Sequence, residues 1–215
     1  MKFTKKLLQQ MLSSAMAAVA ANVDELNRLD AATGDGDHGT AILAAIKAAA
    51  SSSQKDGDLA KTLETIGWDV MSSASGSTST LTGSFFIGMA NAVVSDELNL
   101  SETIAIFESG LDNVKASTKA AIGDKTLMDA LIPAIEAMVG LKDSGKSIVD
   151  VFQSAYEAAQ KGADSTKNLI AKFGRAKNIG DRSRGNLDAG AVSTAIIYKS
   201  YAETIQNTDQ NSELN

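Results

Sequence analysis

The stretch Thr126-Leu-Met-Asp-Ala-Leu-Ile-Pro-Ala-Ile-Glu-Ala-Met-Val139 shows how this 215-residue chain is built. Thr126 followed three residues later by Asp129 has the pattern of a capping box, which marks the start of a helix. The apolar residues behind it recur three and four positions apart, as on one face of a helix. They are Leu131, Ile132, Ile135, Met138 and Val139. Pro133, the only proline of the chain, predicts a kink in this helix.

Similar signals along the rest of the chain predict an all-α, single-domain protein with about eight helices and no convincing sheet. We expect helices at about residues 4–22, 38–50, 58–70, 81–94, 101–114, 126–139, 147–173 and 188–206. The expected N-caps include Asp37, Ser101, Ser147 and Asp188.

The segments between these helices are polar. Residues 72–82 are rich in Ser, Thr and Gly and indicate a loop, although residues 77–87 also have strand propensity. Residues 174–187 are expected to form a long polar loop. The domain would cover residues 1–206, followed by a disordered polar tail at residues 207–215.

Composition excludes several classes of protein. Lys and Arg number 20 against 26 Asp and Glu, and the resulting charge of −6 argues against a nucleic-acid partner. The hydrophobic fraction of 44% and the charged fraction of 21% are those of a globular domain. The absence of cysteine excludes disulfides, thiolate catalysis and cysteine-based zinc sites. A single histidine leaves oxygen ligands for any metal, which favours Mg²⁺, Ca²⁺ or Mn²⁺.

The N-terminal residues allow two interpretations. Lysines followed by an apolar, alanine-rich run resemble a secretory signal. Polar residues interrupt that run, however, and apolar residues recur on one face at helical spacing, which favours an amphipathic first helix. No run approaches the ~18 apolar residues of a membrane span. We therefore expect a cytoplasmic protein without a membrane partner.

The segment Asp30-Ala-Ala-Thr-Gly-Asp35-Gly-Asp37-His38-Gly-Thr40 precedes the second expected helix. Its three carboxylates lie within eight residues, and the glycines among them allow tight turns. The carboxylates would repel one another, so a bound divalent cation such as Mg²⁺ is the natural compensation. The alternative is a solvated acidic loop in which Asp37 only caps the helix. His38 could bind a ligand or cap the same helix.

Three further polar loops could hold an anion. Ser75-Gly-Ser-Thr-Ser-Thr80 offers hydroxyls, backbone N–H groups and a following helix N-terminus, which together bind phosphate. By itself the same segment could be a flexible linker. Gly123-Asp-Lys-Thr126 adds a lysine, and residues 174–184 add three arginines, whose planar side chains suit phosphate oxygens. A solvated loop is the alternative for the arginine-rich segment.

One motif matches a nucleotide-binding pattern but lacks its context. Gly140-Leu-Lys-Asp-Ser-Gly-Lys-Ser147 fits the P-loop pattern letter for letter. A P-loop requires a buried strand before its glycines, whereas helix-spaced residues precede this segment. We therefore interpret it as a turn between two helices, with Ser147 as the cap.

Several motifs occur in a fixed order between about residues 27 and 194. They are Leu29-Asp30 with Gly34 to Gly39, Gly83-Ser-Phe-Phe86, Gly123-Asp-Lys-Thr-Leu-Met-Asp-Ala130, Gly174-Arg-Ala176 with Gly180-Asp-Arg-Ser183, and Asp188-Ala-Gly-Ala191. In this order they resemble the nucleotide-binding L subunit of the dihydroxyacetone kinase family. The resemblance implies a barrel of eight antiparallel helices with the nucleotide site in loops at one end.

The resemblance also implies roles for individual residues. Asp30, Asp35 and Asp37 would hold two Mg²⁺ ions against the phosphates of ADP or ATP, and together with Arg175 they would be the catalytic residues. The expected nucleotide contacts are His38, Gly39, Thr40, Ala41, Ser77, Thr78, Gly123, Leu127, Arg175, Asp188, Ala189 and Gly190.

The function implied by the resemblance is a phosphoryl relay. A separate L subunit of this family keeps ADP bound as a cofactor, receives a phosphoryl group from a phosphocarrier (M-type) subunit, and passes it to dihydroxyacetone or a similar short ketose on a K subunit. This is a phosphoenolpyruvate-dependent glycerone phosphotransferase, and the length of 215 residues favours it over the longer fused kinase that uses ATP. The alternatives are an ADP-sensing subunit that reports to a transcriptional regulator, and an ATP-exchanging kinase subunit for another short ketose. A homodimer is left open.

Two loops depart from the family pattern. The chain reads Gly76-Ser-Thr-Ser-Thr-Leu-Thr-Gly83 where the family usually has Gly-Ala-Ser-Gly-Pro-Leu-Tyr-Gly, and Asp188-Ala-Gly190 where it has Asp-Pro-Gly. Both changes remove a proline and so loosen the backbone next to the expected phosphates. They leave open which ketose is used and how tightly ADP is held.

Overall fold

Nine α-helices are present in the residues that the computed structural model describes, 1–74 and 76–213. They are α1 (Lys5–Ala20), α2 (Val23–Ala31), α3 (His38–Ser52), α4 (Leu59–Ser73), α5 (Ser77–Asn91), α6 (Leu100–Ser117), α7 (Met128–Gly140), α8 (Ile148–Ser165) and α9 (Ala189–Glu213). Two 3-10 helices, η1 (Thr166–Asn168) and η2 (Arg175–Ser183), and two short strands, β1 (Phe3–Thr4) and β2 (Glu97–Leu98), complete them. The expected all-α class is confirmed.

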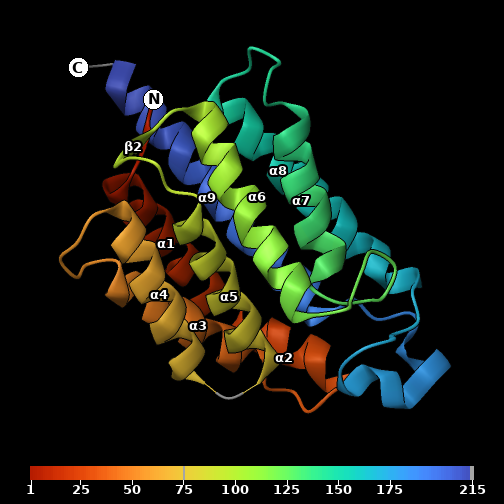
Figure 1. Cartoon of the computed structure of the whole chain (residues 1–215). Helices are drawn as coiled ribbons and strands as arrows, with labels where there is room; N and C mark the ends of the chain where they lie inside the picture. The colour runs from red at the N-terminus through yellow and green to blue at the C-terminus, as the bar shows by residue number, and fades with distance from the viewer. Residues whose placement is uncertain (75, 214–215) are drawn as a thin grey trace.

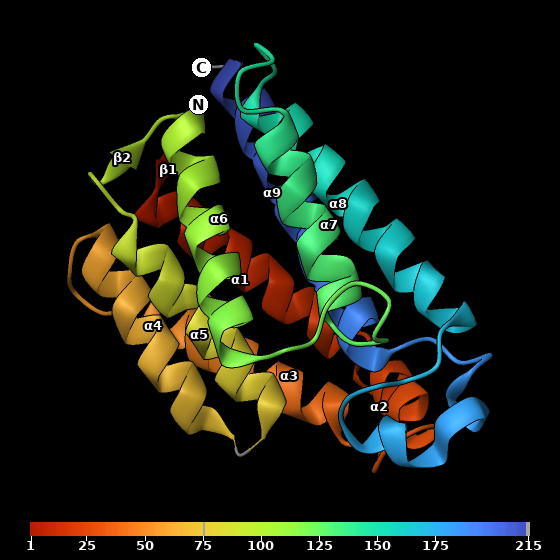
Figure 2. The same cartoon turned by 45° about the vertical axis from the view of Figure 1, so that its right-hand side comes forward.

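Eight of the helices form a closed ring. α1 packs against α3, and each following helix packs against the next until α9 returns to α1. α2 lies outside this ring and packs against α3 and α9. Neighbouring helices run in opposite directions, as Figures 1 and 2 show. The closed order is consistent with the barrel that the resemblance implies.

Phe107 joins several elements in the interior of the ring. Its ring contacts Phe152 of α8 edge to face at 5.3 Å between centroids, and it makes similar contacts with Phe85 of α5 and Phe3 of β1. Phe3, Phe107 and Phe152 are almost completely buried. Edge-to-face aromatic pairs add to the free energy gained from burial itself. A small sheet, in which Phe3 pairs with Leu98, holds the N-terminus against this cluster. It consists of two strands of two residues each, so the expectation of no convincing sheet is confirmed for the described residues.

The structure corrects the expected helices in the N-terminal half. Residues 23–31 form α2, which the sequence patterns did not predict. α5 begins at Ser77 rather than near residue 81, so neither the expected loop nor the alternative strand forms there. The small residues serve close packing, because a Cβ added at Gly83 would lie 2.5 Å from the carbonyl oxygen of Gly67 in α4. Sequence propensity alone does not reveal that contact.

Several helix ends also differ from expectation. The N-cap of α6 is Asn99, which forms a capping box with Glu102, so Ser101 does not cap it. α8 ends at Ser165 instead of continuing toward residue 173, and η2 occupies much of the expected loop at 174–187. α9 continues to Glu213, beyond Gln206, where we expected disorder; residues 214–215 lie outside the described part.

Two capping predictions have mixed outcomes. The capping box of Ser147 and Asp150 is confirmed, so the segment that resembles a P-loop is a turn between α7 and α8. At the start of α7, the Asp129 carboxylate accepts the backbone N–H of Thr126 as a capping box requires. The Thr126 hydroxyl, however, accepts the N–H of Met128 and not that of Asp129.

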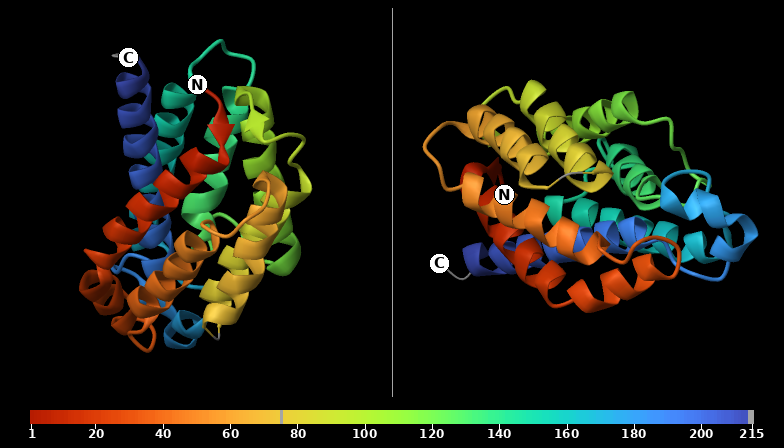
Figure 3. Two further views of the ribbon diagram at one scale, coloured as in Figure 1. Left: turned by 90° about the vertical axis from the view of Figure 1, so that its left-hand side faces the viewer. Right: turned by 90° about the horizontal axis from the view of Figure 1, so that it is seen from below.

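The alternation of helix direction gathers one set of loops at one end of the ring. The N-termini of α3, α5, α7 and α9 all lie there, next to η2, as Figure 1 and the view from below in Figure 3 show. The turn that resembles a P-loop lies at the other end, near both chain termini. None of the helices in the described part of the chain combines the length and the apolar character that crossing a bilayer requires.

Gly162 permits the closest approach of α7 and α8. Pro133 lies inside α7, and since it has no N–H it cannot donate to the carbonyl of Asp129 in the preceding turn. That carbonyl faces Gly162 of α8, where an added Cβ would collide with it. The kink expected at Pro133 stays a prediction.

We expect Gly162→Ala to lower the free energy of unfolding by up to about 2 kcal/mol, because overpacking costs about 1–3 kcal/mol and the gain in helix propensity returns only about 1 kcal/mol. Urea unfolding would measure this. Gly140→Ala is the matched control, since an added Cβ there has no atom within 4 Å. A Gly162→Ala variant as stable as the control variant would contradict the assigned contact.

Candidate functional site

A cleft opens at the loop end of the ring. Its walls come from the turn between α2 and α3, the first residues of α3 and α5, the loop before α7, the segment at 173–176, and the start of α9. The space between these walls is about 1360 Å³, including the open mouth. Segments far apart in the sequence therefore meet here, with room for a small-molecule ligand.

Three carboxylates converge on one side of this cleft. The side chains of Asp30, Asp35 and Asp37 each offer an oxygen, and these oxygens all lie within 4.8 Å of one another. All three residues line the cleft. Carboxylate oxygens are the ligands that Mg²⁺ prefers, and Mg²⁺ commonly takes one or two of them together with substrate phosphates. The residues present therefore fit a divalent cation.

The turn after α2 holds this arrangement in place. Asp30, the penultimate residue of α2, accepts the backbone N–H groups of Gly36 and Asp37 through one carboxylate oxygen, at 2.8 and 3.0 Å. Gly36 has a φ of 79°, which a residue with a side chain rarely adopts. Asp37 is the N-cap residue of α3, but its side chain makes no capping hydrogen bond. The expectation that the Asp37 side chain caps α3 is therefore wrong, and its carboxylate is left for a ligand.

The charges in this part of the cleft are incompletely balanced. Burial raises the pKa of Asp37 above its ordinary value, and the neighbouring Asp35 and Asp30 raise it further. Arg175 partly opposes this effect and forms an ion pair with Asp35. One guanidinium thus faces three carboxyl groups. A bound cation would complete the neutralisation and favour the charged form of all three.

Two helix N-termini face the same cleft without a side-chain cap. Neither Asp37 at α3 nor Gly76 at α5 makes a side-chain capping bond. Ser77 and Thr78 of α5 line the cleft beside Gly76. Uncapped N-termini present backbone N–H groups and a partial positive charge, which bind phosphate. Ser75, the first residue of the expected anion loop, lies outside the described residues.

His38 connects α3 with α5 and α9. Its Nε2 lies 2.9 Å from the hydroxyl oxygen of Ser193 in α9, and its Nδ1 lies 3.4 Å from that of Thr78 in α5. Burial lowers the pKa of His38, which favours the neutral ring. Behind it lies an apolar cavity inside the ring, lined by residues such as Ile42 and Phe86. His38 therefore separates the polar cleft from the apolar interior.

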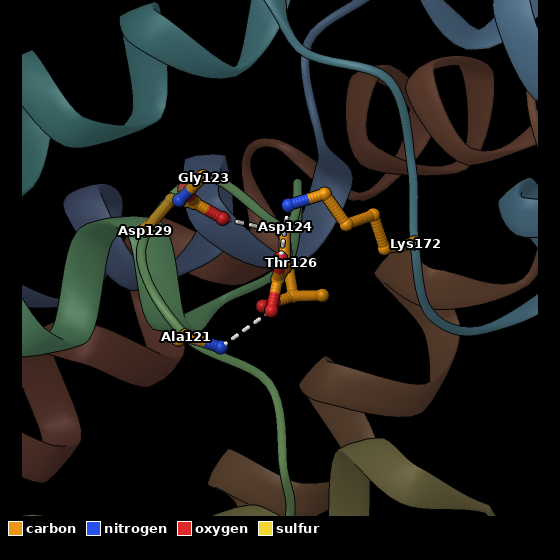
Figure 4. A network of polar contacts seen from close by, with 6 residues as sticks. All are labelled: Ala121, Gly123, Asp124, Thr126, Asp129 and Lys172. Carbon is orange, nitrogen blue, oxygen red and sulfur yellow. Dashed lines mark hydrogen bonds and ion pairs between the residues drawn. The ribbon is translucent and has the colours of Figure 1, made fainter.

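The loop before α7 forms another wall and is tightly bonded. Asp129 accepts the N–H groups of Gly123 and Thr126, and Asp124 accepts that of Ala121, as Figure 4 shows. Lys172 donates to Asp124 at 2.8 Å from the opposite segment. These bonds stabilise a loop that has no regular secondary structure.

The structure brings most of the expected nucleotide contacts into the cleft. The expected residues that line it are His38, Ala41, Ser77, Thr78, Leu127, Arg175, Asp188, Ala189 and Gly190. Three do not line it. Gly39 packs against Val23, Thr40 bonds to Asn27, and the N–H of Gly123 donates to Asp129. The roles of the expected residues stay predictions.

The cleft also contains residues that the sequence analysis did not assign to it. They include Thr33, Gly34, Thr118, Ala120, Lys125, Thr126 and Phe173. The signal for Lys125 was present, since it stands in the Gly123-Asp-Lys-Thr126 segment, which we had marked for its charge and as part of a family motif without giving Lys125 itself a role. Phe173 and Thr118 gave no signal, because only the packing of distant segments brings them to the cleft.

Comparison with known proteins supports the family resemblance. Residues 32–203 match the family model described as the DAK2 domain. L-erythrulose kinase of Pectobacterium atrosepticum is 36% identical over 94% of this chain but only 35% of its own length. The ADP-binding subunit of PEP-dependent dihydroxyacetone kinase 1 of Listeria innocua is 30% identical over 95% of this chain and 98% of its own length. The ADP-binding subunit of the Escherichia coli kinase is 32% identical over 82% of this chain and 86% of its own length.

Solved structures show the same fold. The native dihydroxyacetone kinase of C. freundii is similar with a TM-score of 0.70 and 28% identity, over 92% of this chain and 34% of that chain. The same kinase in complex with AMP-PNP and Mg²⁺ gives a TM-score of 0.70 and 27% identity, over 94% of this chain. The chain thus spans about a third of this kinase and of L-erythrulose kinase.

Asp188 should make the stability of the protein depend on pH. Its carboxyl group accepts the N–H of Ala191 at the start of α9, and burial raises its pKa to about 7. An unfolded Asp has a pKa of about 3.9, so the folded state binds the additional proton between about pH 4 and 7. The free energy of unfolding contributed by this group is complete below about pH 4 and is lost as the pH rises to 7.

We expect the free energy of unfolding of the wild-type protein to fall from pH 5 to pH 7 relative to Asp188→Asn, whose side chain does not titrate. Urea unfolding at a series of pH values, without nucleotide or metal, would measure the difference. Asp143→Asn, in the exposed turn at the other end, should follow the wild type. Parallel curves for the wild type and Asp188→Asn would contradict the raised pKa.

Proposed function

This chain belongs to the DAK2 domain family, and we propose that it is the nucleotide-binding unit of a kinase that phosphorylates dihydroxyacetone or a similar short ketose. The observation that carries this proposal is the meeting of three carboxylates and two uncapped helix N-termini in one cleft. The carboxylates suit divalent cations, and the helix N-termini suit phosphate oxygens. A nucleoside diphosphate or triphosphate bound with Mg²⁺ presents both.

Different residues of the cleft would bind the cations and the phosphates. Asp30, Asp35 and Asp37 would hold two Mg²⁺ ions, and the start of α5 at Ser77 and Thr78 would receive phosphate oxygens. When bound, the ions would neutralise phosphate charge, which is the main requirement of phosphoryl transfer. The guanidinium of Arg175 would turn from Asp35 to the transferring group, where its planar side chain can donate two hydrogen bonds.

We propose that the ketose is supplied by a partner K subunit. A short ketose offers one carbonyl and a few hydroxyl groups, whereas the assigned cleft residues suit phosphates and cations. The single histidine, His38, contacts Ser193 and Thr78. This division also agrees with the names of two relatives whose length the chain spans almost completely, which are ADP-binding subunits.

The source of the phosphoryl group divides two versions of the proposal. In the first, ADP stays bound and is recharged by a phosphocarrier subunit that takes its phosphoryl group from phosphoenolpyruvate. The name of the Listeria relative as a PEP-dependent subunit supports it. In the second, the unit exchanges ADP for ATP and serves a ketose such as erythrulose. The 36% identity with L-erythrulose kinase supports that version, as do the losses of proline near Thr80 and at Ala189.

The metal assignment is tested by the binding of ADP. We expect Asp35→Asn to weaken ADP binding in the presence of Mg²⁺ by roughly tenfold or more, because it removes one charged ligand of the cation. Isothermal titration calorimetry with and without Mg²⁺ would measure this. Asp143→Asn should bind ADP as the wild type does. If the wild type neither releases ADP on denaturation nor binds it with Mg²⁺, the proposed function fails.

Arg175 is expected to act on turnover more than on binding. In a reaction reconstituted with K and phosphocarrier subunits, or with ATP, Arg175→Ala should lower turnover by roughly 10²-fold, as for loss of one donor to a developing charge. Its ADP affinity should change much less. Lys177→Ala is the matched control, since this exposed lysine of η2 does not line the cleft. Equal losses of turnover in Arg175→Ala and Lys177→Ala would refute a specific role for Arg175. Turnover of the wild type with each phosphodonor and each ketose would choose between the two versions of the proposed function.

A further inference from the structure

Lys125 has an unusual backbone conformation. Its φ is 61°, and among the described residues it is the only one other than glycine with a positive φ. A residue with a side chain pays a conformational cost there, which the surrounding structure must offset. The chain nevertheless has lysine at this position and not glycine. The side chain must therefore contribute something that glycine could not.

The Lys125 side chain is buried and bridges two other segments. Only 2% of the residue is exposed. Its ammonium group donates to the carbonyl of Thr166 at 2.6 Å and to the carbonyl of Asn186. Thr166 begins the segment that follows α8, and Asn186 lies two residues before Asp188. One side chain thus ties the loop before α7 to both ends of the long segment between α8 and α9.

The charge of Lys125 is balanced locally. Burial lowers its pKa, whereas the carboxylates of Asp188 and Asp129 favour its charged form. Asp129 is already bonded to two backbone N–H groups of the same loop. Asp188 gains from the lysine a positive neighbour in a buried position, which lowers the cost of its charge.

These contacts set the start of α9 beside the loop. The N–H of Asp188 donates to the hydroxyl of Thr166 at 2.9 Å, next to the carbonyl that Lys125 binds. Gly190 lies so close to Leu127 that an added Cβ would approach the Leu127 side chain to 3.2 Å. Leu127, Asp188 and Gly190 all line the cleft. Their relative placement therefore depends on how this loop and α9 are joined.

We propose that Lys125 is a positioning residue, whose buried ammonium group holds the loop at 123–127 against the start of α9 and so shapes one wall of the nucleotide cleft. This inference rests on the proposed function for its ligand. Lys125 itself need not touch the nucleotide. Its role is to keep Leu127 and the turn at 188–190 at a fixed separation.

Lys172 provides a matched comparison within the same part of the structure. It too joins the loop before α7 to the segment after α8, through Asp124, as Figure 4 shows. Its side chain is 62% exposed, and its ammonium group donates to Asp124 and not to residues 186–190. The Asp124 side chain is only 12% exposed, but it keeps its bond from the N–H of Ala121 when the ion pair is lost. Loss of Lys172 should therefore leave the start of α9 in place.

The test compares Lys125→Met, Lys125→Arg and Lys172→Met. Methionine keeps the length of the side chain and the cost of the backbone conformation, but it removes the ammonium group. We expect Lys125→Met to weaken ADP binding with Mg²⁺ by about tenfold or more, the size expected when hydrogen bonds from a charged group are lost. Lys125→Arg should recover most of the affinity, and Lys172→Met should bind ADP as the wild type does. An affinity of Lys125→Met equal to that of the wild type would overturn the proposal.

A measurement without ligand separates this proposal from the proposed function. Hydrogen exchange of the backbone amides at 186–192 should become faster in Lys125→Met but not in Lys172→Met, while exchange in α6 changes little. If the wild type binds no ADP, the proposed function fails, and this local exchange still decides the role of Lys125. Unchanged exchange at 186–192, or an equal increase throughout the chain, would overturn the proposal.

Lys125→Met also leaves two carbonyl groups without their donor and could so fail to fold. In that case the same measurements are made on Lys125→Met with Asp188→Asn, against Asp188→Asn alone. Weaker ADP binding and faster local exchange in the double variant would support the positioning role. If Lys125→Met and the double variant both fail to fold while Lys125→Arg folds, the lysine serves folding as a whole, and the proposal is overturned.

Discussion

The closing contact between α9 and α1 is the constraint on which the rest of the structure depends. Because it completes a ring in which neighbouring helices run in opposite directions, alternate helices must begin at the same end. α3, α5, α7 and α9 therefore direct their N-termini, with their partial positive charge, toward one cleft. The ring also gives the loops between these helices a rigid support, so that residues on loops can hold a fixed geometry.

Charged residues form two groups beside this cleft. On one side, Asp30, Asp35 and Asp37 converge and are only partly balanced by Arg175. On the other, the ammonium group of Lys125 is buried among carbonyl groups and near Asp188. The first group has negative charge in excess, which is suited to cations that arrive with a ligand. In the second group the ammonium group is hydrogen-bonded and its charge is balanced within the chain, which suits a wall of fixed geometry.

The sequence predicted the elements whose signals are local. The helical period, the capping box at Ser147 and the acidic turn at 30–37 each follow from neighbouring residues, and all three are present in the structure. The start of α5 was missed because its Ser and Gly residues serve contacts with α4, and propensity does not report on partners. α2 was missed because it is short and has only two buried apolar residues, Leu26 and Leu29, which are too few to show a helical period. The cap at Asn99 was missed because Ser101 has an equally suitable side chain.

By itself, the sequence determined the helical class, the chemistry available to the site and the family, because these depend on which residues are present and in what order. Only the tertiary structure decided that Asp37 does not use its side chain as a cap, that Gly39 and Thr40 face α2 rather than the cleft, and that Lys125 joins three segments. These outcomes depend on contacts between residues up to 61 positions apart in the chain. Such contacts arise only when the ring closes, and no local pattern in the sequence records them.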